Sequence, residues 1–333
     1  MKILAGDIGG TKSELAIFDT DKPQVLRLGM GFLNHKQANL IFMLRNFIAN
    51  ADMPLQAACL AVAGTVRNGC CHVPNLSWIL DEQELSVALG IERVTLLNDL
   101  VATAHGMLTL PPEELMVIKT GISEAKGNIA LIAAGTGLGE AILFHHEEDG
   151  YQVAASEGGH VDYAPNNEEE IDLLRYLWSR FGQASWERVV SGLGLVNIYD
   201  FLSQTAKVAE LTQVTTRIMA AADRAAAIAQ TAQLKESPRC VLAMDIFLHN
   251  YGAASGNLAP KALATGGIYI GGGIAPKLHR EIWMGSFMLA FSNKGRFSDM
   301  LSNIPVKLIL EPKTALLGAA AYAASWDFIV KKD

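Results

Sequence analysis

GDIGGTKSELAI, at residues 6–17, is the stretch of this sequence that decides the fold. The apolar residues around its start predict a strand over residues 2–6, and the glycines predict a tight turn into a second strand over 14–19. Because glycine has no side chain, backbone N–H groups in such a turn can face an anion at close range. The stretch therefore predicts an antiparallel pair with an anion-binding turn, although an ordinary hairpin would also explain the glycines.

Downstream of this pair, strands and helices are predicted in a regular order. A third strand is expected over 25–29, followed by a helix over 37–50. Two further strands are expected over 57–63 and 92–97, and the second runs into a helix over 99–108. Strands joined by tight turns form antiparallel pairs, and strands separated by helices form parallel pairs. The first third of the chain thus reads as one mixed α/β sheet.

The same order begins again near residue 128. GTGLGEAIL at 135–143 is similar to GGTKSELAI at 9–17, since each is a Gly/Thr turn followed by a strand that opens with Glu. This similarity predicts an internal duplication, although two unrelated hairpins would also explain it. Helices are expected to dominate 168–257, including an Ala-rich surface pair over 203–237, and the expected strands are 128–134, 140–144, 151–154, 268–270 and 306–310.

Composition excludes several classes of function. The chain has 333 residues, of which 50% are hydrophobic and 18% charged, which suits two domains or one large two-lobed molecule. Its net charge of −7 and scattered basic residues argue against nucleic acid as a partner. Apolar stretches are interrupted well before the roughly 20 residues that a membrane span needs. The four cysteines form no CxxC pair, so we expect free thiols in a cytoplasmic protein.

LLNDL at 96–100 delivers Asn98 and Asp99 to the carboxyl end of a buried strand. Open α/β sheets bind ligands at this edge, so Asp99 is a candidate general base. Aspartate is also a favourable helix N-cap, and Asp99 precedes a predicted helix. These residues alone do not decide between the two roles.

Further polar and glycine motifs suit a phosphorylated nucleotide and a sugar. Asp7 ends the first strand, where a carboxylate can hold Mg²⁺ through water. AGTGLG at 134–139 predicts a second phosphate-facing turn, and GGG at 271–273 leaves room for an adenine or a ribose. Glu157 and His160 flank a glycine pair and suit hydrogen bonds to ring hydroxyls, whereas the acidic run at 168–170 is expected to begin a helix.

Taken together, these segments resemble the bacterial glucokinase family of the hexokinase–actin–chaperone ATPase superfamily. The matching stretches run nearly end to end: GDIGGTK (6–12), LNDL (97–100), AAGTGLGEA (133–141), SEGGHVDYAPN (156–166), WERVVSGLGLVNIY (186–199), YIGGGIAPK (269–277), GRF (295–297) and LLGAAAY (316–322). The resemblance implies a two-lobed actin-like ATPase fold of duplicated ribonuclease H-like βββαβαβα domains with a cleft between the lobes. The small α/β domain would be 1–110 plus 313–333, and the large one 111–312 with a helical insert around 168–257.

The resemblance also implies an activity, the ATP-dependent phosphorylation of glucose at its 6-hydroxyl, with Asp99 as catalytic base. It implies ATP and Mg²⁺ as cofactors and a homodimeric enzyme. The sugar ligands would be Asn98, Asp99, Glu157, His160 and Glu187, and Asp7 would lie near Mg²⁺. The nucleotide ligands would be Gly9, Gly10, Thr11, Lys12, Gly135, Thr136, Gly137, Gly271 and Gly272.

Two stretches depart from the family pattern. SGLG at 191–194 lacks a proline that is often present there, and AGTV at 63–66 lacks the usual Gly-Pro or Cys-Pro. The alternatives at this stage are a kinase for mannose or an N-acetylated amino sugar, a non-catalytic sugar regulator, and an actin-like or chaperone ATPase. ADP or polyphosphate could replace ATP as donor. The missing cysteine cluster disfavours the zinc-containing repressor/kinase relatives.

Overall fold

A computed structural model describes the chain except residues 11, 21–23, 35–36, 38, 50–53, 74–75, 77, 123–125, 149, 206–207, 279–282 and 331–333. The chain forms two compact units, and each is described by itself. Unit 1 comprises Met1–Glu114 and Glu311–Asp333, and unit 2 comprises Leu115–Leu310. Within the described ranges, none of the helices combines the length and the apolar character that a membrane crossing requires.

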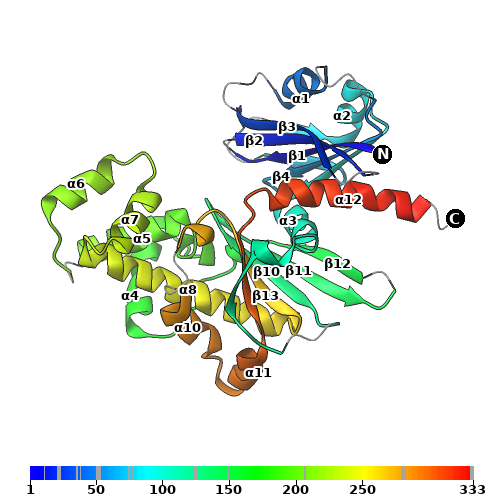
Figure 1. Cartoon of the computed structure of the whole chain (residues 1–333). Coiled ribbons are helices and arrows are strands. Elements are labelled where there is room, and N and C mark those ends of the chain that lie inside the picture. Colours follow the sequence, from blue (N-terminus) through cyan, green and yellow to red (C-terminus); the bar gives the residue numbers. More distant parts are fainter. Residues whose placement is uncertain are drawn as a thin grey trace. The chain divides into compact units, whose positions relative to one another are not determined.

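Unit 1 is built on a five-stranded sheet with the order β3-β2-β1-β4-β8 (Figure 1). The strands are β1 (Lys2–Ile8), β2 (Lys12–Asp19), β3 (Gln24–Leu33), β4 (Ala57–Val62) and β8 (Arg93–Asn98). The first three strands pair antiparallel, whereas β1, β4 and β8 run parallel. This pairing confirms the prediction for the start of the chain.

Both faces of this sheet are covered, because neighbouring residues of a strand point to opposite sides. Leu4 and Ile8 of β1 join a core cluster with residues of α1 (Leu40–Ala49) and α2 (Glu82–Leu89). Ile3 and Ala5 join a second cluster with residues of α12 (Thr314–Val330). Strand β4 is buried at every position, as expected for a parallel strand covered on both sides.

Helix α3 (Asp99–Met107) packs closely against α12 through glycines. A Cβ added to Gly318 would lie 1.7 Å from the carbonyl oxygen of Ala102, so only glycine allows this approach. The contact holds α3, which begins at Asp99, to the rest of unit 1. A small sheet and a 3-10 turn that we did not predict complete the unit: β5 (Val66–Arg67), β6 (Cys70–His72), β7 (Ile79–Asp81) and η2 (Pro112–Glu114).

Unit 2 contains a six-stranded sheet with the order β12-β11-β10-β13-β14-β9. The strands are β9 (Leu115–Lys119), β10 (Ile129–Ala134), β11 (Leu138–His146), β12 (Gly150–Ser156), β13 (Gly267–Gly271) and β14 (Val306–Ile309). From β12 to β14, the sheet repeats the strand order of unit 1, with the same antiparallel and parallel pairs. The predicted internal duplication is therefore confirmed, and β9 is an additional strand that we did not predict.

Helices occupy the segment between β12 and β13, as predicted (Figure 1). The bounds are η3 (Gly158–His160), α4 (Glu168–Phe181), η4 (Trp186–Arg188), α5 (Gly192–Gln204), α6 (Thr212–Ala220), α7 (Arg224–Gln233) and α8 (Pro238–Ala262). After β13 come η5 (Ala275–Lys277), η6 (Trp283–Phe287), α10 (Met288–Ser292), η7 (Gly295–Phe297) and α11 (Ser298–Asn303). Asn167 caps α4 and the three glutamates fill its first turn, which confirms that the acidic run begins a helix. The four cysteines are free thiols.

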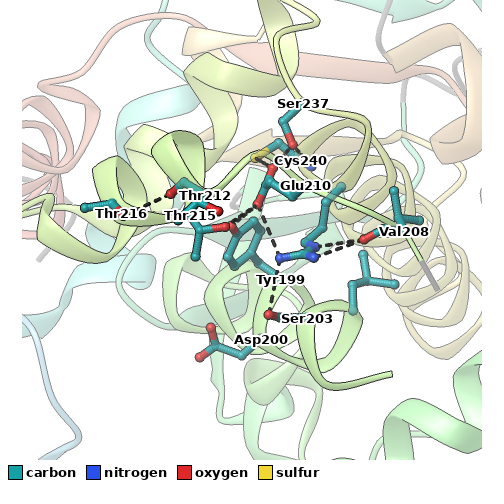
Figure 2. Close-up of polar contacts among 12 residues, drawn as sticks. Tyr199, Asp200, Ser203, Val208, Glu210, Thr212, Thr215, Thr216, Ser237 and Cys240 are labelled. Carbon is teal, nitrogen blue, oxygen red and sulfur yellow. Dashed lines mark hydrogen bonds and ion pairs between the residues drawn. The ribbon is translucent and has the colours of Figure 1, made fainter. Parts of the chain in front are cut away.

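Glu210 is the centre of a buried polar network in unit 2 (Figure 2). Its carboxylate, whose side chain is 1% exposed, accepts hydrogen bonds from the hydroxyls of Tyr199 and Ser237. The guanidinium of Arg239 lies 3.4 Å from the same carboxylate and donates to the carbonyl oxygen of Val208 at 3.0 Å. The network thereby attaches the chain between α5 and α6 to the start of α8.

Replacing Glu210 with alanine is expected to lower the unfolding free energy by about 3–5 kcal/mol, because Arg239 would remain buried without its carboxylate. Thermal unfolding followed by circular dichroism measures this loss. The matched control is Glu236→Ala, which breaks an exposed pair with Arg217 and is expected to cost less than about 1 kcal/mol. Equal losses in the two variants would contradict a stabilising role for the network.

Candidate active site

The parallel strands of unit 1 end in polar residues at one edge of the sheet. Asp7 lies near the carboxyl end of β1, and Asn98 is the last residue of β8. Strand β4 lies between them and pairs with both strands. The topology therefore brings Asp7, Asn98 and Asp99 to the same edge, as the sequence predicted for a ligand-binding edge.

Asn98, rather than Asp99, caps helix α3. The side-chain oxygen of Asn98 accepts hydrogen bonds from the backbone N–H groups of Leu100 and Val101 at 2.9 and 3.3 Å. Its Nδ2 donates to the carbonyl oxygen of Gly64 at 3.2 Å, within the stretch that departs from the family pattern. Asp99 is the first residue of the helix, with one carboxylate oxygen 2.9 Å from the N–H of Leu100. The capping role considered for Asp99 thus belongs to its neighbour.

Turn A (residues 9–12) connects β1 to β2. The N–H of Gly9 donates to the carbonyl oxygen of Lys12 at 3.0 Å, which closes the turn. Gly10 follows β1 and Lys12 opens β2 with an exposed side chain, whereas the predicted ligand Thr11 lies outside the described residues.

Two buried residues that we did not predict hold turn A in place. The Nδ2 of Asn34 donates to the carbonyl oxygen of Gly9 at 2.7 Å, and Ser13 donates to the Oδ1 of Asn34 at 2.7 Å. Both side chains are almost fully buried. Only the tertiary fold brings Asn34 to the turn, because the intervening chain forms β2 and β3.

Asp7 lies beside two further carboxylates. Glu14 is directly opposite Asp7 in the β1–β2 ladder, and Asp99 follows β8. Burial above all, then repulsion from Asp99 and Glu14, raises the pKa of Asp7 from 3.8 to about 7. A divalent cation would offset this concentration of negative charge, so the residues fit Mg²⁺. Among the described residues, no three His, Cys, Asp or Glu side chains form a metal-binding group.

Turn B (residues 135–137) connects β10 to β11 in unit 2. The N–H of Gly135 donates to the carbonyl oxygen of Gly137, and the carbonyl oxygen of Gly135 accepts from Gly192, both at 2.8 Å. Turn B is thereby attached to the start of α5. Thr136 is the central residue of the turn and the only one with a side chain.

The three predicted sugar ligands of unit 2 lie together. The Nδ1 of His160 is 3.9 Å from a carboxylate oxygen of Glu157, and its Nε2 is 3.9 Å from an oxygen of Glu187. Glu157 and His160 are exposed, whereas Glu187 is largely buried. A ligand with several hydroxyl groups could accept and donate hydrogen bonds among these side chains.

Glu187 also connects this sugar cluster (Glu157, His160 and Glu187) to turn B. Its Oε2 accepts from the N–H of Leu138 at 3.0 Å, immediately after the turn. A Cβ on Gly137 would lie 2.4 Å from the same oxygen, so a larger residue there would displace the Glu187 carboxylate. One carboxylate thus contacts both the sugar cluster and turn B.

Glu140 is a buried carboxylate that the sequence analysis did not select. A Cβ on Gly158 would lie 1.9 Å from its Oε2, so Glu140 packs directly beneath the turn between Glu157 and His160. Burial raises the pKa of Glu140 above its ordinary value. The sequence signal for this residue is a glutamate among apolar residues in AAGTGLGEA (133–141).

Turn C (residues 271–273) begins at the last residue of β13 and packs against Ala134, which precedes turn B. Gly272 has a φ of 87°, and a Cβ there would lie 2.2 Å from the carbonyl oxygen of Ala134. Both the conformation and the close approach require glycine. The predicted nucleotide ligands Gly271 and Gly272 are therefore adjacent to the start of turn B.

The structure thus assembles two groups of predicted residues. Asp7, Asn98 and Asp99 gather in unit 1, and turns B and C with the sugar cluster gather in unit 2. The meeting of Asp99 with Glu157, His160 and Glu187 stays a prediction, since these residues belong to different units.

The sheets of the two units share one strand order, and glycine turns and polar side chains follow the strands at one edge of each sheet. This arrangement defines the two-lobed actin-like ATPase fold, the class that includes sugar kinases. The family model described as Glucokinase matches residues 4–326. The chain belongs to the glucokinase family.

Individual relatives agree with this assignment. A glucokinase from Nostoc punctiforme is 38% identical over 337 residues, which cover 97% of this chain and 98% of the relative. The crystal structure of glucokinase from an Antarctic psychrotroph matches with a TM-score of 0.80 at 30% identity and covers 97% of this chain and 98% of that one. A ROK family glucokinase from Streptomyces griseus shares the fold, with a TM-score of 0.68 at 20% identity and coverage of 97% and 99%.

Replacing Asp7 with asparagine is expected to stabilise the protein without ligands at pH 8. The raised pKa means that between pH 3.8 and about 7 the folded state keeps a proton that the unfolded state loses. The stability from this site is therefore present at acid pH and lost as the pH rises through about 7. The asparagine side chain stays neutral, so the variant should gain up to about 4 kcal/mol at pH 8 and little at pH 4.

Urea unfolding of both proteins in EDTA, at pH 4 and pH 8, measures this difference. A variant that is less stable than the wild-type protein at pH 8 would contradict the electrostatic description of Asp7.

Proposed function

We propose that this protein transfers the γ-phosphoryl group of ATP to the 6-hydroxyl of glucose, giving glucose 6-phosphate that feeds glycolysis, with Asp99 as catalytic base. Membership of the glucokinase family supports glucose and ATP as substrates, and the Streptomyces griseus relative is in complex with glucose and AMPPNP. The observation that carries the choice of base is the position of Asp99 at the ligand-binding edge of the unit 1 sheet, beside Asp7.

The sugar is held by side chains that contribute complementary hydrogen-bonding groups. Glu157 and Glu187 accept from hydroxyls, while His160 and the amide of Asn98 can also donate. Glu187 adds a constraint, because its other oxygen contacts the backbone beside turn B at 3.0 Å. Sugar and phosphate positions are therefore coupled through one side chain.

The chemical step needs a base placed at the 6-hydroxyl. The Asp99 carboxylate accepts the hydroxyl proton as the oxygen attacks the γ-phosphorus, and the bond to the bridging oxygen of ADP breaks. Asp99 is the first residue of α3, directly after the carboxyl end of β8. The packing of α3 on α12 fixes the helix and hence the base.

The nucleotide is held by turns A, B and C. Turns A and B would each offer backbone N–H groups to the phosphates, Lys12 and Thr136 would add side-chain donors as the resemblance implies for Thr11 too, and turn C would take the adenosine. Asp7 would hold Mg²⁺ through water, and the ion would supply positive charge that offsets the charge of the phosphates. We further propose a cytoplasmic homodimer, as the family resemblance implies.

A coupled assay of ATP-dependent phosphorylation across several hexoses tests this function. We expect the highest kcat/KM with glucose and little turnover of ATP when no sugar is present. A higher kcat/KM with mannose or N-acetylmannosamine would show that this sugar, rather than glucose, is the substrate. ATP turnover independent of sugar would favour an actin-like or chaperone ATPase instead.

Asp99→Asn is expected to lower kcat by about 10²–10⁴-fold, because the amide cannot accept the hydroxyl proton. Glucose should still bind, and calorimetry measures that binding separately from turnover. Glu113→Gln, an exposed acidic residue of the same unit, is the control and should keep wild-type kinetics. A kcat close to that of the wild-type enzyme in Asp99→Asn would remove Asp99 from the role of base.

A further inference from the structure

Tyr251 lies within α8 and is fully buried in unit 2. Its ring packs edge-on against three aromatic rings, those of Phe247, Trp283 and Phe287, with centroids 5.9, 5.8 and 5.8 Å away. A ring held by these contacts has little freedom to turn aside. The aromatic cluster therefore fixes the position of the hydroxyl.

The hydroxyl reaches the carboxyl ends of β10 and β13, where each strand runs into a glycine turn. It accepts a hydrogen bond from the backbone N–H of Ala134 at 3.1 Å. Its one proton faces two acceptors, the carbonyl oxygen of Ile132 at 3.3 Å and that of Gly271 at 3.4 Å. One side chain thus links the ends of two strands through backbone groups alone.

These backbone groups lie immediately beside the two turns that we assign to the nucleotide. Ala134 precedes turn B, and Gly271 is the first residue of turn C. The carbonyl oxygen of Ala134 also packs against Gly272 and accepts from the N–H of Ile274 at 3.4 Å. A change at the Tyr251 hydroxyl would therefore act on both turns at once.

We propose that Tyr251 is a positioning residue for ATP, whose hydroxyl sets the separation of turns B and C. The proposal rests on the proposed function, because it takes these turns as the nucleotide site. The hydroxyl touches no substrate, since it is covered by the strands that it links. Its effect is to preorganise the backbone groups that contact the nucleotide, which lowers the cost of binding.

Tyr251→Phe removes the hydroxyl and keeps the ring in its aromatic cluster. We expect the KM for ATP to rise about five- to tenfold, since a buried N–H would lose its acceptor. The KM for glucose should rise by less than the KM for ATP, because the hydroxyl bonds to the strand ends beside turns B and C and acts on the sugar cluster only through Leu138 and Glu187. The Kd for MgADP, measured by calorimetry, should rise in parallel with the KM for ATP.

Tyr199→Phe is the matched control, because it also removes one buried tyrosine hydroxyl from unit 2. Tyr199 serves the Glu210 network instead (Figure 2), so this variant should lose stability without a change in either KM. An unchanged KM for ATP and an unchanged Kd for MgADP in Tyr251→Phe would overturn the proposal. Equal increases in the two KM values would overturn it as well, since they indicate general loosening.

Two further readouts separate the possible failures. If the wild-type protein fails to phosphorylate glucose, the proposed function is wrong. The Kd for MgADP in Tyr251→Phe still tests the positioning role of Tyr251 in that case. Hydrogen exchange in the wild-type protein tests the contact even if Tyr251→Phe does not fold. The Ala134 amide should exchange slowly and slow further with MgADP, and exchange at the rate of a surface amide would overturn the inference.

Discussion

Close approach of one backbone segment to another is the constraint on which the predicted nucleotide site in unit 2 depends. Gly272 lies against the carbonyl oxygen of Ala134, and Gly159 lies against that of Leu138, at separations that leave no room for a Cβ. Backbone N–H and C=O groups can therefore face a ligand without side chains in the way. This packing also carries a cost, because each turn must be held rigidly by other residues. Tyr251, Glu187 and the N-terminus of α5 supply that support.

The predicted site residues of unit 1 are carboxylates that lie close together, whereas those of unit 2 depend on close backbone packing. Burial above all, and then repulsion from Asp99 and Glu14, raises the pKa of Asp7, an arrangement that weakens the protein without ligands. Such strain is understandable where a magnesium nucleotide brings compensating positive charge. The Asn98 cap and the close packing of α3 on α12 keep the carboxylate of Asp99 at the same edge.

Most of the sheet framework could be predicted from local pattern. The strands beside the Gly/Thr turns are apolar and well bounded, and the similarity of 9–17 to 135–143 revealed the duplication. The strands β5, β6 and β7 were missed because they are two or three residues long, too short for a periodicity. Strand β9 was missed because it is a short edge strand outside the repeated five-strand order, so the duplication did not indicate it. The roles of Asn34, Glu140 and Tyr251 were missed because their contacts join distant segments.

The sequence by itself determined the motifs: which turns carry glycine, which strands end in carboxylates, and which family the chain resembles. Tertiary structure alone decided that His160 lies between Glu157 and Glu187, and that Asn98 rather than Asp99 caps α3. The physical reason is that propensity and spacing act over a few residues. Hydrogen bonds and electrostatic repulsion act over a few ångströms, and the folded chain alone determines which distant residues come that close.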